Sequence, residues 1–216
     1  MSLPHFFLRE QVLAFESAPV FALHLDADDT KHAKVLRLAV GEHIAVVDAV
    51  SDYFECEIVS FEGDELSVSI AQKLSSYARP EVVLVQGLAK GEKMDTIVRH
   101  ATEVGIAEFV PMTTSRSVVK LDAKKSKARF ERWASIAKSA AMQSGRSSKP
   151  VVHAPCSVAG AVDIAKDCDA VLICWEEAEL SSTLAEAVSC CIAATGKDPR
   201  SLRIALVVGP EGGLTA

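Results

Sequence analysis

The stretch 203-RIALVVGPEGGLT-215 decides the fold class of this chain of 216 residues. The run 203–208 is mainly apolar and has the length of a strand, and a glycine-rich loop follows it at once. Strands that are apolar on both faces are typical of parallel sheets covered by helices. Thr215 stands where the N-cap of a further helix is expected. The stretch therefore predicts an α/β domain in which a buried strand ends in a glycine-rich loop.

The glycine-rich loop that follows this strand has two interpretations. Ligands of open α/β sheets bind at the carboxyl ends of strands. Gly212 and Gly213 can adopt positive φ and let a ligand approach the backbone, and Pro210 stiffens the loop. The loop has neither the Lys-Ser/Thr of a P-loop nor the G-x-G-x-x-G spacing. It is therefore either part of a cofactor site or a tight strand-to-helix turn.

The same alternation of strands and helices extends back to a linker at residues 74–80 (LSSYARP). Apolar strands are expected at 82–86, 106–111 and 171–175, and helices at 92–104, 130–144 and 183–194. Gly105 is a stop signal for the helix 92–104. We therefore expect an α/β domain with a mostly parallel sheet over residues 80–216.

The chain before the linker has a different pattern. Alternating or β-branched runs predict strands at 43–48, 53–61 and 66–70, with a turn between the last two. A helix is expected at 29–38, with Asp29 or Thr30 as its N-cap. Short antiparallel strands of this kind predict a small β-barrel over residues 1–73.

Charge divides the chain into three parts, although the net charge is −6. Residues 1–78 hold 5 basic and 13 acidic side chains, residues 79–150 hold 14 and 7, and residues 151–216 hold 4 and 9. A basic middle part can attract phosphates locally, because screening confines the effect to about 10 Å. Such a run is also common on a solvated helix face. RNA binding by the middle part is therefore one of two interpretations.

Composition and motifs exclude several classes of protein. The hydrophobic fraction of 49% and the mean hydropathy of +0.21 predict a packed core. No apolar run reaches the roughly 18 residues of a membrane span, and MSLPHFFLRE lacks a signal-peptide pattern, so a cytoplasmic protein is expected. The six cysteines form no C-x-x-C pair, and we expect reduced thiols and no metal site. Hydrolase chemistry has no support, because no Ser-His-Asp arrangement is evident.

Several segments together resemble one family. They are HFFL near the start, HAKVLRL at 32–38, KGEKMDTIVRHATEVGI at 90–106, SRSVVK at 115–120, RWASIAKSAAMQSGR at 132–146 and VVGPEGGLTA at 207–216. The chain is similar to the ribosomal RNA small subunit methyltransferase E (RsmE) family. The resemblance implies an N-terminal PUA-like barrel and a C-terminal SPOUT domain with a trefoil knot. It further implies a homodimer that binds S-adenosylmethionine in the knot and methylates N3 of a uridine in 16S ribosomal RNA.

The functional residues expected from the motifs fall into two sets. The expected cofactor residues are Trp175, Glu176, Gly209, Pro210, Glu211, Gly212, Gly213 and Leu214. The expected RNA-binding residues are Arg9, His32, Arg37, Lys90, Lys93, Arg116, Lys120 and Arg146. Methylation requires loss of the N3 proton and stabilisation of a developing uracil anion, and a cation suits the second task. Arg9, Arg116 and Arg146 are the candidates for that catalytic cation, and no metal is expected.

The sequence departs from the family pattern at its end. It stops at Ala216, where the resemblance implies a further helix, strand, arginine-containing loop and final helix. We therefore expect a domain truncated at the C-terminus, whose cofactor site and activity are incomplete in this polypeptide. A non-catalytic RNA-binding or ribosome-assembly protein with a degenerate knot domain is the alternative. A nucleotide-dependent α/β enzyme is a further alternative, but its glycine pattern and acidic ribose ligand are missing.

Overall fold

The computed structural model describes residues 3–75, 78–119, 121–175 and 183–214. Lys120, Glu176 and Thr215, which the sequence singled out, lie outside the described residues. No helix in the described ranges is long and apolar enough to cross a membrane.

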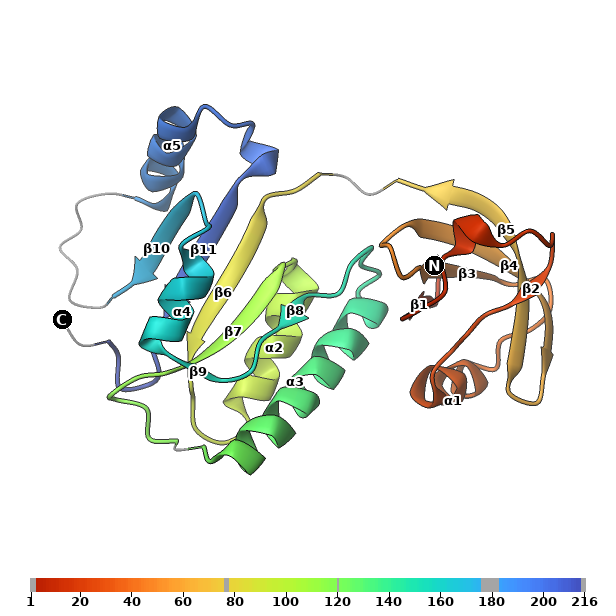
Figure 1. Ribbon diagram of the computed structural model, residues 1–216, viewed down its shortest axis with the longest axis horizontal. Coiled ribbons are helices and arrows are strands. Elements are labelled where there is room, and N and C mark those ends of the chain that lie inside the picture. Colours follow the sequence, from red (N-terminus) through yellow and green to blue (C-terminus); the bar gives the residue numbers. More distant parts are fainter. Residues whose placement is uncertain (1–2, 76–77, 120, 176–182, 215–216) are drawn as a thin grey trace. The chain divides into compact units, whose positions relative to one another are not determined.

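Figure 1 shows that the chain forms two compact units. The first contains residues 1–77 and 141–149, and the second contains residues 78–140 and 150–216. Residues 141–149 therefore belong to the first unit although they follow a long part of the second. The sequence pattern, which predicted two contiguous parts, gave no sign of this return.

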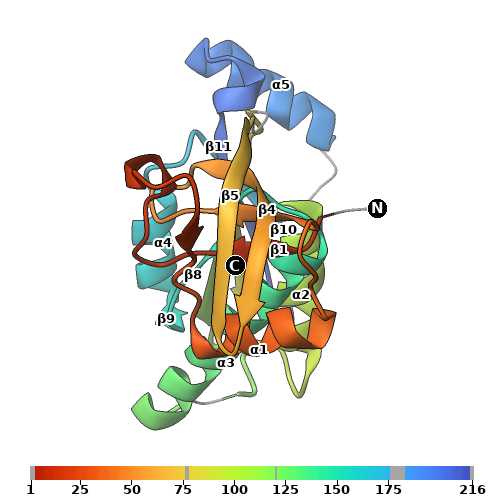
Figure 2. The same cartoon turned by 90° about the vertical axis from the view of Figure 1, so that its right-hand side faces the viewer.

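The first unit contains a five-stranded sheet with the order β1-β3-β4-β5-β2. Its strands are β1 (His5–Phe7), β2 (Phe21–Ala22), β3 (His43–Val47), β4 (Tyr53–Glu62) and β5 (Glu65–Leu74). β1 runs parallel to β3, and the other neighbours are antiparallel. The long hairpin of β4 and β5 is visible in both views (Figures 1 and 2). In β4 the alternating residues Phe54, Cys56 and Ile58 are buried, so one face of the hairpin builds the core.

The helix of the first unit begins earlier than its sequence predicted. α1 spans Ala27–Leu36, and its N-cap is Asp26, whose carboxylate accepts a hydrogen bond from the Asp29 N–H at 2.8 Å. The prediction of Asp29 or Thr30 as the N-cap was therefore wrong, because Asp26 offers the same side-chain acceptor one turn earlier. The helix ends at Arg37, which adopts a left-handed conformation with φ 55°.

The second unit contains a parallel sheet of six strands with the order β10-β11-β6-β7-β8, to which β9 adds by pairing with β7. The strands are β6 (Glu81–Gly87), β7 (Glu108–Thr113), β8 (Val151–Val152), β9 (Cys156–Ser157), β10 (Ala170–Cys174) and β11 (Arg203–Val208). The chain proceeds from β6 outward to β7 and β8, then crosses to β10 and β11 on the other side of β6. The direction of winding thus reverses between β6 and β11, which is where open α/β sheets bind ligands.

Helices cover both faces of this sheet. They are α2 (Lys93–Val104), α3 (Ala123–Gln143), α4 (Val158–Ala165) and α5 (Leu184–Thr195). α2 and α3 pack on the face that carries Leu84 and Phe109, with Trp133 buried among them. α4 packs on the opposite face against Val83 and Val110. α5 packs against β10 and β11 through Cys191 and Leu202.

Three predictions for this unit need correction. α3 begins at Ala123 rather than at residue 130, and the strand expected at 106–111 is β7, Glu108–Thr113. α4 was not predicted at all. Ser157 caps α4 by accepting a hydrogen bond from the Gly160 N–H, and this serine was its one local signal.

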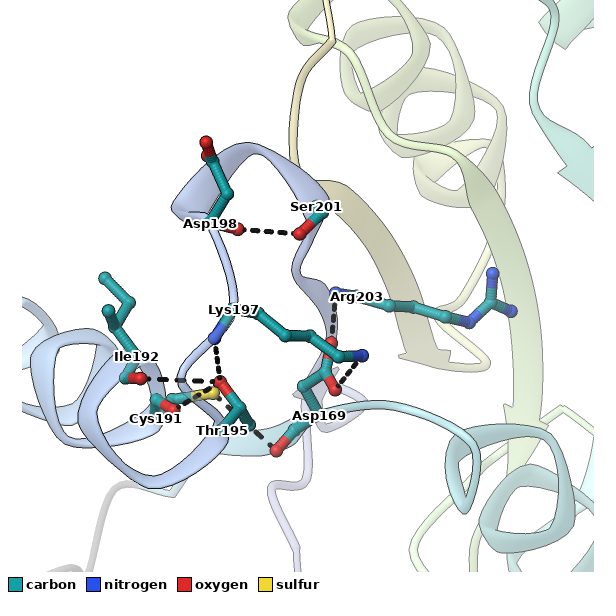
Figure 3. Close-up of polar contacts among 8 residues, drawn as sticks. All are labelled: Asp169, Cys191, Ile192, Thr195, Lys197, Asp198, Ser201 and Arg203. Atoms are coloured by element: carbon teal, nitrogen blue, oxygen red, sulfur yellow. Dashed lines mark hydrogen bonds and ion pairs between the residues drawn. The ribbon is translucent and has the colours of Figure 1, made fainter.

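Polar side chains join the strands at the amino-terminal edge of the sheet. The carboxylate of Asp169 accepts hydrogen bonds from Lys197 Nζ at 2.6 Å and from the Arg203 N–H at 2.9 Å (Figure 3). The Arg203 guanidinium binds the carboxylates of Glu81, at 2.8 Å, and Glu108. This network therefore joins the starts of β6, β7 and β11.

Candidate functional site

The ends of β6 and β11 approach each other closely where the winding reverses. A Cβ at Gly87 would lie 2.4 Å from the nitrogen of Pro210, so only glycine fits there. The buried Gln86 amide donates hydrogen bonds to the carbonyl of Gly87 at 3.0 Å and to that of Gly209 at 3.1 Å. The two strand ends are thus fixed together, and the glycine loop, defined as Gly209–Leu214, starts from a rigid base.

Glycine is favoured at each of the three glycine positions of the loop for a different physical reason. Gly213 has φ 70°, and its N–H donates to the Pro210 carbonyl at 2.9 Å, which closes a turn. Gly209 lies so close to Gly213 that a Cβ would come within 3.0 Å of its carbonyl carbon. Gly212 does not have positive φ, contrary to the expectation, but a Cβ there would lie 3.3 Å from the Cβ of Arg116.

Two cations hold the loop from neighbouring segments. The Glu211 carboxylate accepts hydrogen bonds from Lys93 Nζ at 2.8 Å and from the Lys90 N–H at 3.1 Å. Arg116 Nη1 donates to the Gly212 carbonyl at 2.8 Å. The ammonium of Lys93, together with backbone N–H donors, lowers the pKa of Glu211 to about 2. The carboxylate is therefore ionised throughout the physiological range.

A cavity of about 450 Å³ opens beside the loop, within the second unit. This volume is typical of small-molecule sites, which are mostly apolar with a few polar groups. Strands supply its floor, α4 supplies one wall, and the loops after β7, β10 and β11 supply the rest. Its lining residues are Val85, Met112, Thr114, Ser115, Val158, Ala161, Val162, Ala165, Lys166, Val171, Ile173, Trp175, Val207 and Leu214.

Trp175 gives this cavity an unused hydrogen-bond donor. Its indole Nε1 is buried and finds no acceptor among the described residues. A buried donor without a partner costs free energy, and a polar ligand atom would satisfy it. The indole, the glycine backbone and the apolar walls together fit a nucleoside-like ligand that has an aromatic ring and polar edges.

The structure brings together some of the residues expected from the sequence and leaves others apart. Trp175 and Leu214 line the cavity, while Lys90, Lys93 and Arg116 contact the loop beside it. Thr114 and Ser115, as well as the valines of α4, were missed, because their apolar or neutral side chains carry no sequence signal of a site.

The remaining expected residues lie in the first unit. They are Arg9, His32, Arg37 and Arg146. Arg9 is 70% exposed and pairs with Asp26 at 3.0 Å. The His32 ring lies 6.1 Å from that of Phe6.

Six of the 14 basic residues of the middle part lie on α3, within the second unit. Lys124, Lys125 and Lys127 are exposed on its first two turns. Farther along, Arg132 binds Asp95 through Nε at 2.9 Å. Burial acts to raise the pKa of Asp95, but the hydrogen bonds from Arg132 and from the Trp133 indole outweigh it and lower that pKa. Arg132 therefore has a buried partner, while the exposed lysines of the first two turns form surface pairs, Lys125 with Asp122 at 3.5 Å and Lys127 with Glu131 at 4.0 Å.

Comparisons with known proteins agree with this geometry. A family model for an RNA methyltransferase domain matches residues 77–216. The ribosomal RNA small subunit methyltransferase E of Bacillus subtilis (strain 168) is 34% identical over 93% of this chain and 77% of its own length. The protein of the same name from Mycobacterium tuberculosis (strain CDC 1551 / Oshkosh) is 30% identical over 88% of this chain and 71% of its own length.

Solved structures share the fold. A crystal structure described as that of a hypothetical protein matches with a TM-score of 0.81 and 31% identity, over 98% of this chain and 82% of the other. The ribosomal RNA small subunit methyltransferase E from Neisseria gonorrhoeae, bound to S-adenosyl methionine, matches with a TM-score of 0.76 and 23% identity, over 99% and 82%. At that identity the second match is evidence of the fold alone.

Proposed function

The chain belongs to the ribosomal RNA small subunit methyltransferase E family, and on this basis we propose that it methylates N3 of a uridine in 16S ribosomal RNA with S-adenosylmethionine. The observation that carries the proposal is the cavity of about 450 Å³ at the reversal point of the sheet, beside a glycine loop. Sites at such reversal points suit nucleoside ligands, because several strand ends supply backbone groups there.

The cofactor would be held by three groups of this chain. The glycine loop would present backbone groups, and the Trp175 indole N–H would donate to a polar atom of the cofactor. The apolar side chains of Leu214 and Val207 would cover its less polar parts. When bound, S-adenosylmethionine supplies an electrophilic methyl group on its sulfonium.

The chain's part in the chemistry concerns the uracil ring. N3 of uridine carries a proton, so a neighbouring acceptor must take the proton and a cation must stabilise the developing anion on the ring. Among the three candidate arginines, Arg116 lies beside the glycine loop, where its Nη1 donates to the Gly212 carbonyl. Arg9 and Arg146 belong to the first unit, and we propose that they contact RNA.

The RNA would bind chiefly through its phosphates. We propose that the exposed cations on the first turns of α3 contribute, together with Lys90 and Arg116 in the second unit and His32 and Arg37 in the first. α3 begins after the carboxyl end of β7, at the edge of the sheet that carries the glycine loop, so a bound RNA could reach both. Such contacts weaken steeply with salt, because each neutralised phosphate releases counterions.

We propose that the first unit is a PUA-like RNA-binding barrel and that the second is a SPOUT domain with a trefoil knot. The active form would be a homodimer, and it would act in the cytoplasm on the small ribosomal subunit. Family membership supports each of these.

The direct test is methylation of small ribosomal subunits that lack the modification. The protein and labelled S-adenosylmethionine would be added, and nucleosides from the digested RNA would be identified by mass spectrometry. We expect label in N3-methyluridine from 16S RNA, and none with Gly213→Val. Label only in another nucleoside, or only in other RNA, would refute the proposal.

A further inference from the structure

We propose that Lys93 and Arg116 are positioning residues that hold the glycine loop in a binding-competent conformation by way of Glu211 and Gly212. This inference rests on the proposed function, because it assigns the loop to the cofactor. It joins two motifs that lie far apart in the sequence, KGEKMD at 90–95 and GPEGG at 209–213.

The contacts reach two consecutive residues of the loop. Lys93 Nζ binds one oxygen of the Glu211 carboxylate at 2.8 Å, and the Lys90 N–H is 3.1 Å and 3.4 Å from its two oxygens. Arg116 binds the carbonyl of the next residue, Gly212, at 2.8 Å. The donors come from the segments after β6 and after β7, so the outer half of the loop is tied to two neighbouring strand ends.

The loop needs these hydrogen bonds because of its amino-acid composition. A segment with three glycines loses much conformational entropy when it is ordered, and glycine has no side chain to anchor it. The turn from Pro210 to Gly213 has one internal hydrogen bond, at 2.9 Å. Contacts that order the loop before a ligand arrives lower the cost of binding.

The contact between Lys93 and Glu211 is an ion pair, so it predicts a salt dependence of cofactor affinity that apolar packing would not give. The Lys93 and Glu211 side chains are 62% and 39% exposed, so salt screens their attraction. Cofactor affinity should therefore fall as ionic strength rises, and it should depend less on salt when Glu211 is replaced. Lys93 and Arg116, which the sequence assigned to RNA, should then affect cofactor binding in the absence of RNA.

The first test is calorimetric titration of S-adenosylmethionine into variants of the protein. Glu211→Ala leaves both the Lys93 ammonium and the Lys90 N–H without their acceptor, and we expect roughly tenfold weaker binding. Lys93→Met and Arg116→Ala should each weaken binding by about threefold. Glu211→Gln keeps an oxygen for both donors but removes the negative charge, so it should bind more tightly than Glu211→Ala and should depend less on salt than the wild type.

The chain offers a matched control pair. Lys73 and Asp52 lie 2.7 Å apart and their side chains are 58% and 35% exposed, close to the values for Lys93 and Glu211. Asp52→Ala should leave the affinity for S-adenosylmethionine unchanged. An equal loss in Asp52→Ala and Glu211→Ala would overturn the inference, because it would point to a general effect of lost charge.

The second test needs no cofactor. Amide hydrogen exchange at Gly213 reports the stability of the turn from Pro210 to Gly213, which the Lys93–Glu211 ion pair is proposed to hold in place. We expect faster exchange at Gly213 in Glu211→Ala, an intermediate rate in Glu211→Gln and the wild-type rate in Asp52→Ala. A wild-type rate in Glu211→Ala would overturn the inference. If the full-length wild-type protein fails to bind S-adenosylmethionine, the proposed function fails, while the exchange rates still decide whether Lys93 and Glu211 hold the loop.

Discussion

The two edges of the parallel sheet in the second unit both carry ion pairs, but the pairs differ in their exposure to solvent and in the structure that they hold. At the amino-terminal edge, partly buried contacts of Arg203 with Glu108 and with Asp169 link the starts of neighbouring strands, and Figure 3 shows the contact with Asp169. At the carboxyl-terminal edge, Lys93 and Glu211 are more exposed and hold a glycine loop beside a cavity. A charge cluster alone therefore does not identify a site, because the pair that lies beside the cavity is the more exposed of the two.

The largest effect is expected at the carboxyl-terminal edge, from Gly87→Ala. The added Cβ would lie 2.4 Å from the Pro210 nitrogen, which is backbone and cannot move without separating β6 from β11. We expect a loss of about 3 kcal/mol in the free energy of unfolding, together with loss of cofactor binding. Denaturant unfolding and calorimetric titration would measure the two. Wild-type values for both would show that the close approach is not required.

Arg203→Met should separate stability from binding at the other edge. It leaves the carboxylates of Glu81 and Glu108 without their arginine, and we expect a loss of about 2 kcal/mol in stability. The affinity for S-adenosylmethionine should stay within about twofold of the wild type at a temperature where the variant is folded. A large loss of affinity would break the distinction between the edges.

Acid should weaken the amino-terminal edge through Glu108. Burial acts to raise the pKa of its carboxyl, but hydrogen bonds from His153, at 2.6 Å, and from Arg203 outweigh it, so the folded-state pKa lies below 4.5. A depressed pKa contributes stability that is fully present above the unfolded value and is lost as pH falls through the folded value. Thermal melting between pH 7 and pH 3 should therefore show a smaller acid loss for Glu108→Gln than for the wild type. Parallel curves would contradict this.

The smallest effect is expected from Lys197→Met. Its ion pair with Asp169, at 2.6 Å, involves a lysine side chain that is 50% exposed. Exposed pairs contribute little, so we expect a loss of about 0.5 kcal/mol and no change in cofactor affinity. Lys93→Met breaks a similar pair at the other edge, and it should instead weaken cofactor binding by about threefold with little change in the free energy of unfolding. Equal behaviour of the two variants would remove the contrast.

The sequence predicted those parts of the fold that follow from local pattern. The strands at 82–86 and 203–208 were recognisable because each is a nearly continuous apolar run, and Gly105 ended α2 as expected. α4 was missed, because a helix of 8 residues has too few turns to show a period. The start of α3 at Ala123 was missed because its first turns are charged and carry no apolar stripe.

The site was predictable only in part. The glycine loop follows a buried strand, and that local order allowed it to be proposed as a cofactor site. The partnership of Lys93 with Glu211 joins residues 118 positions apart, and no local rule reports such a distance. The same holds for the cavity, since α4 and β10 meet the loop only in the folded chain.

The chain's two tryptophans allow the most direct test of whether the cavity beside the glycine loop binds the cofactor. Trp175 lines the cavity and its indole N–H has no acceptor among the described residues, while the Trp133 indole is buried and donates to Asp95 at 3.0 Å. Nuclear magnetic resonance of the indole N–H groups during titration with S-adenosylmethionine would observe both. We expect the Trp175 signal to shift in step with binding measured by calorimetry and the Trp133 signal to stay in place. Saturated binding with an unmoved Trp175 signal would contradict this expectation.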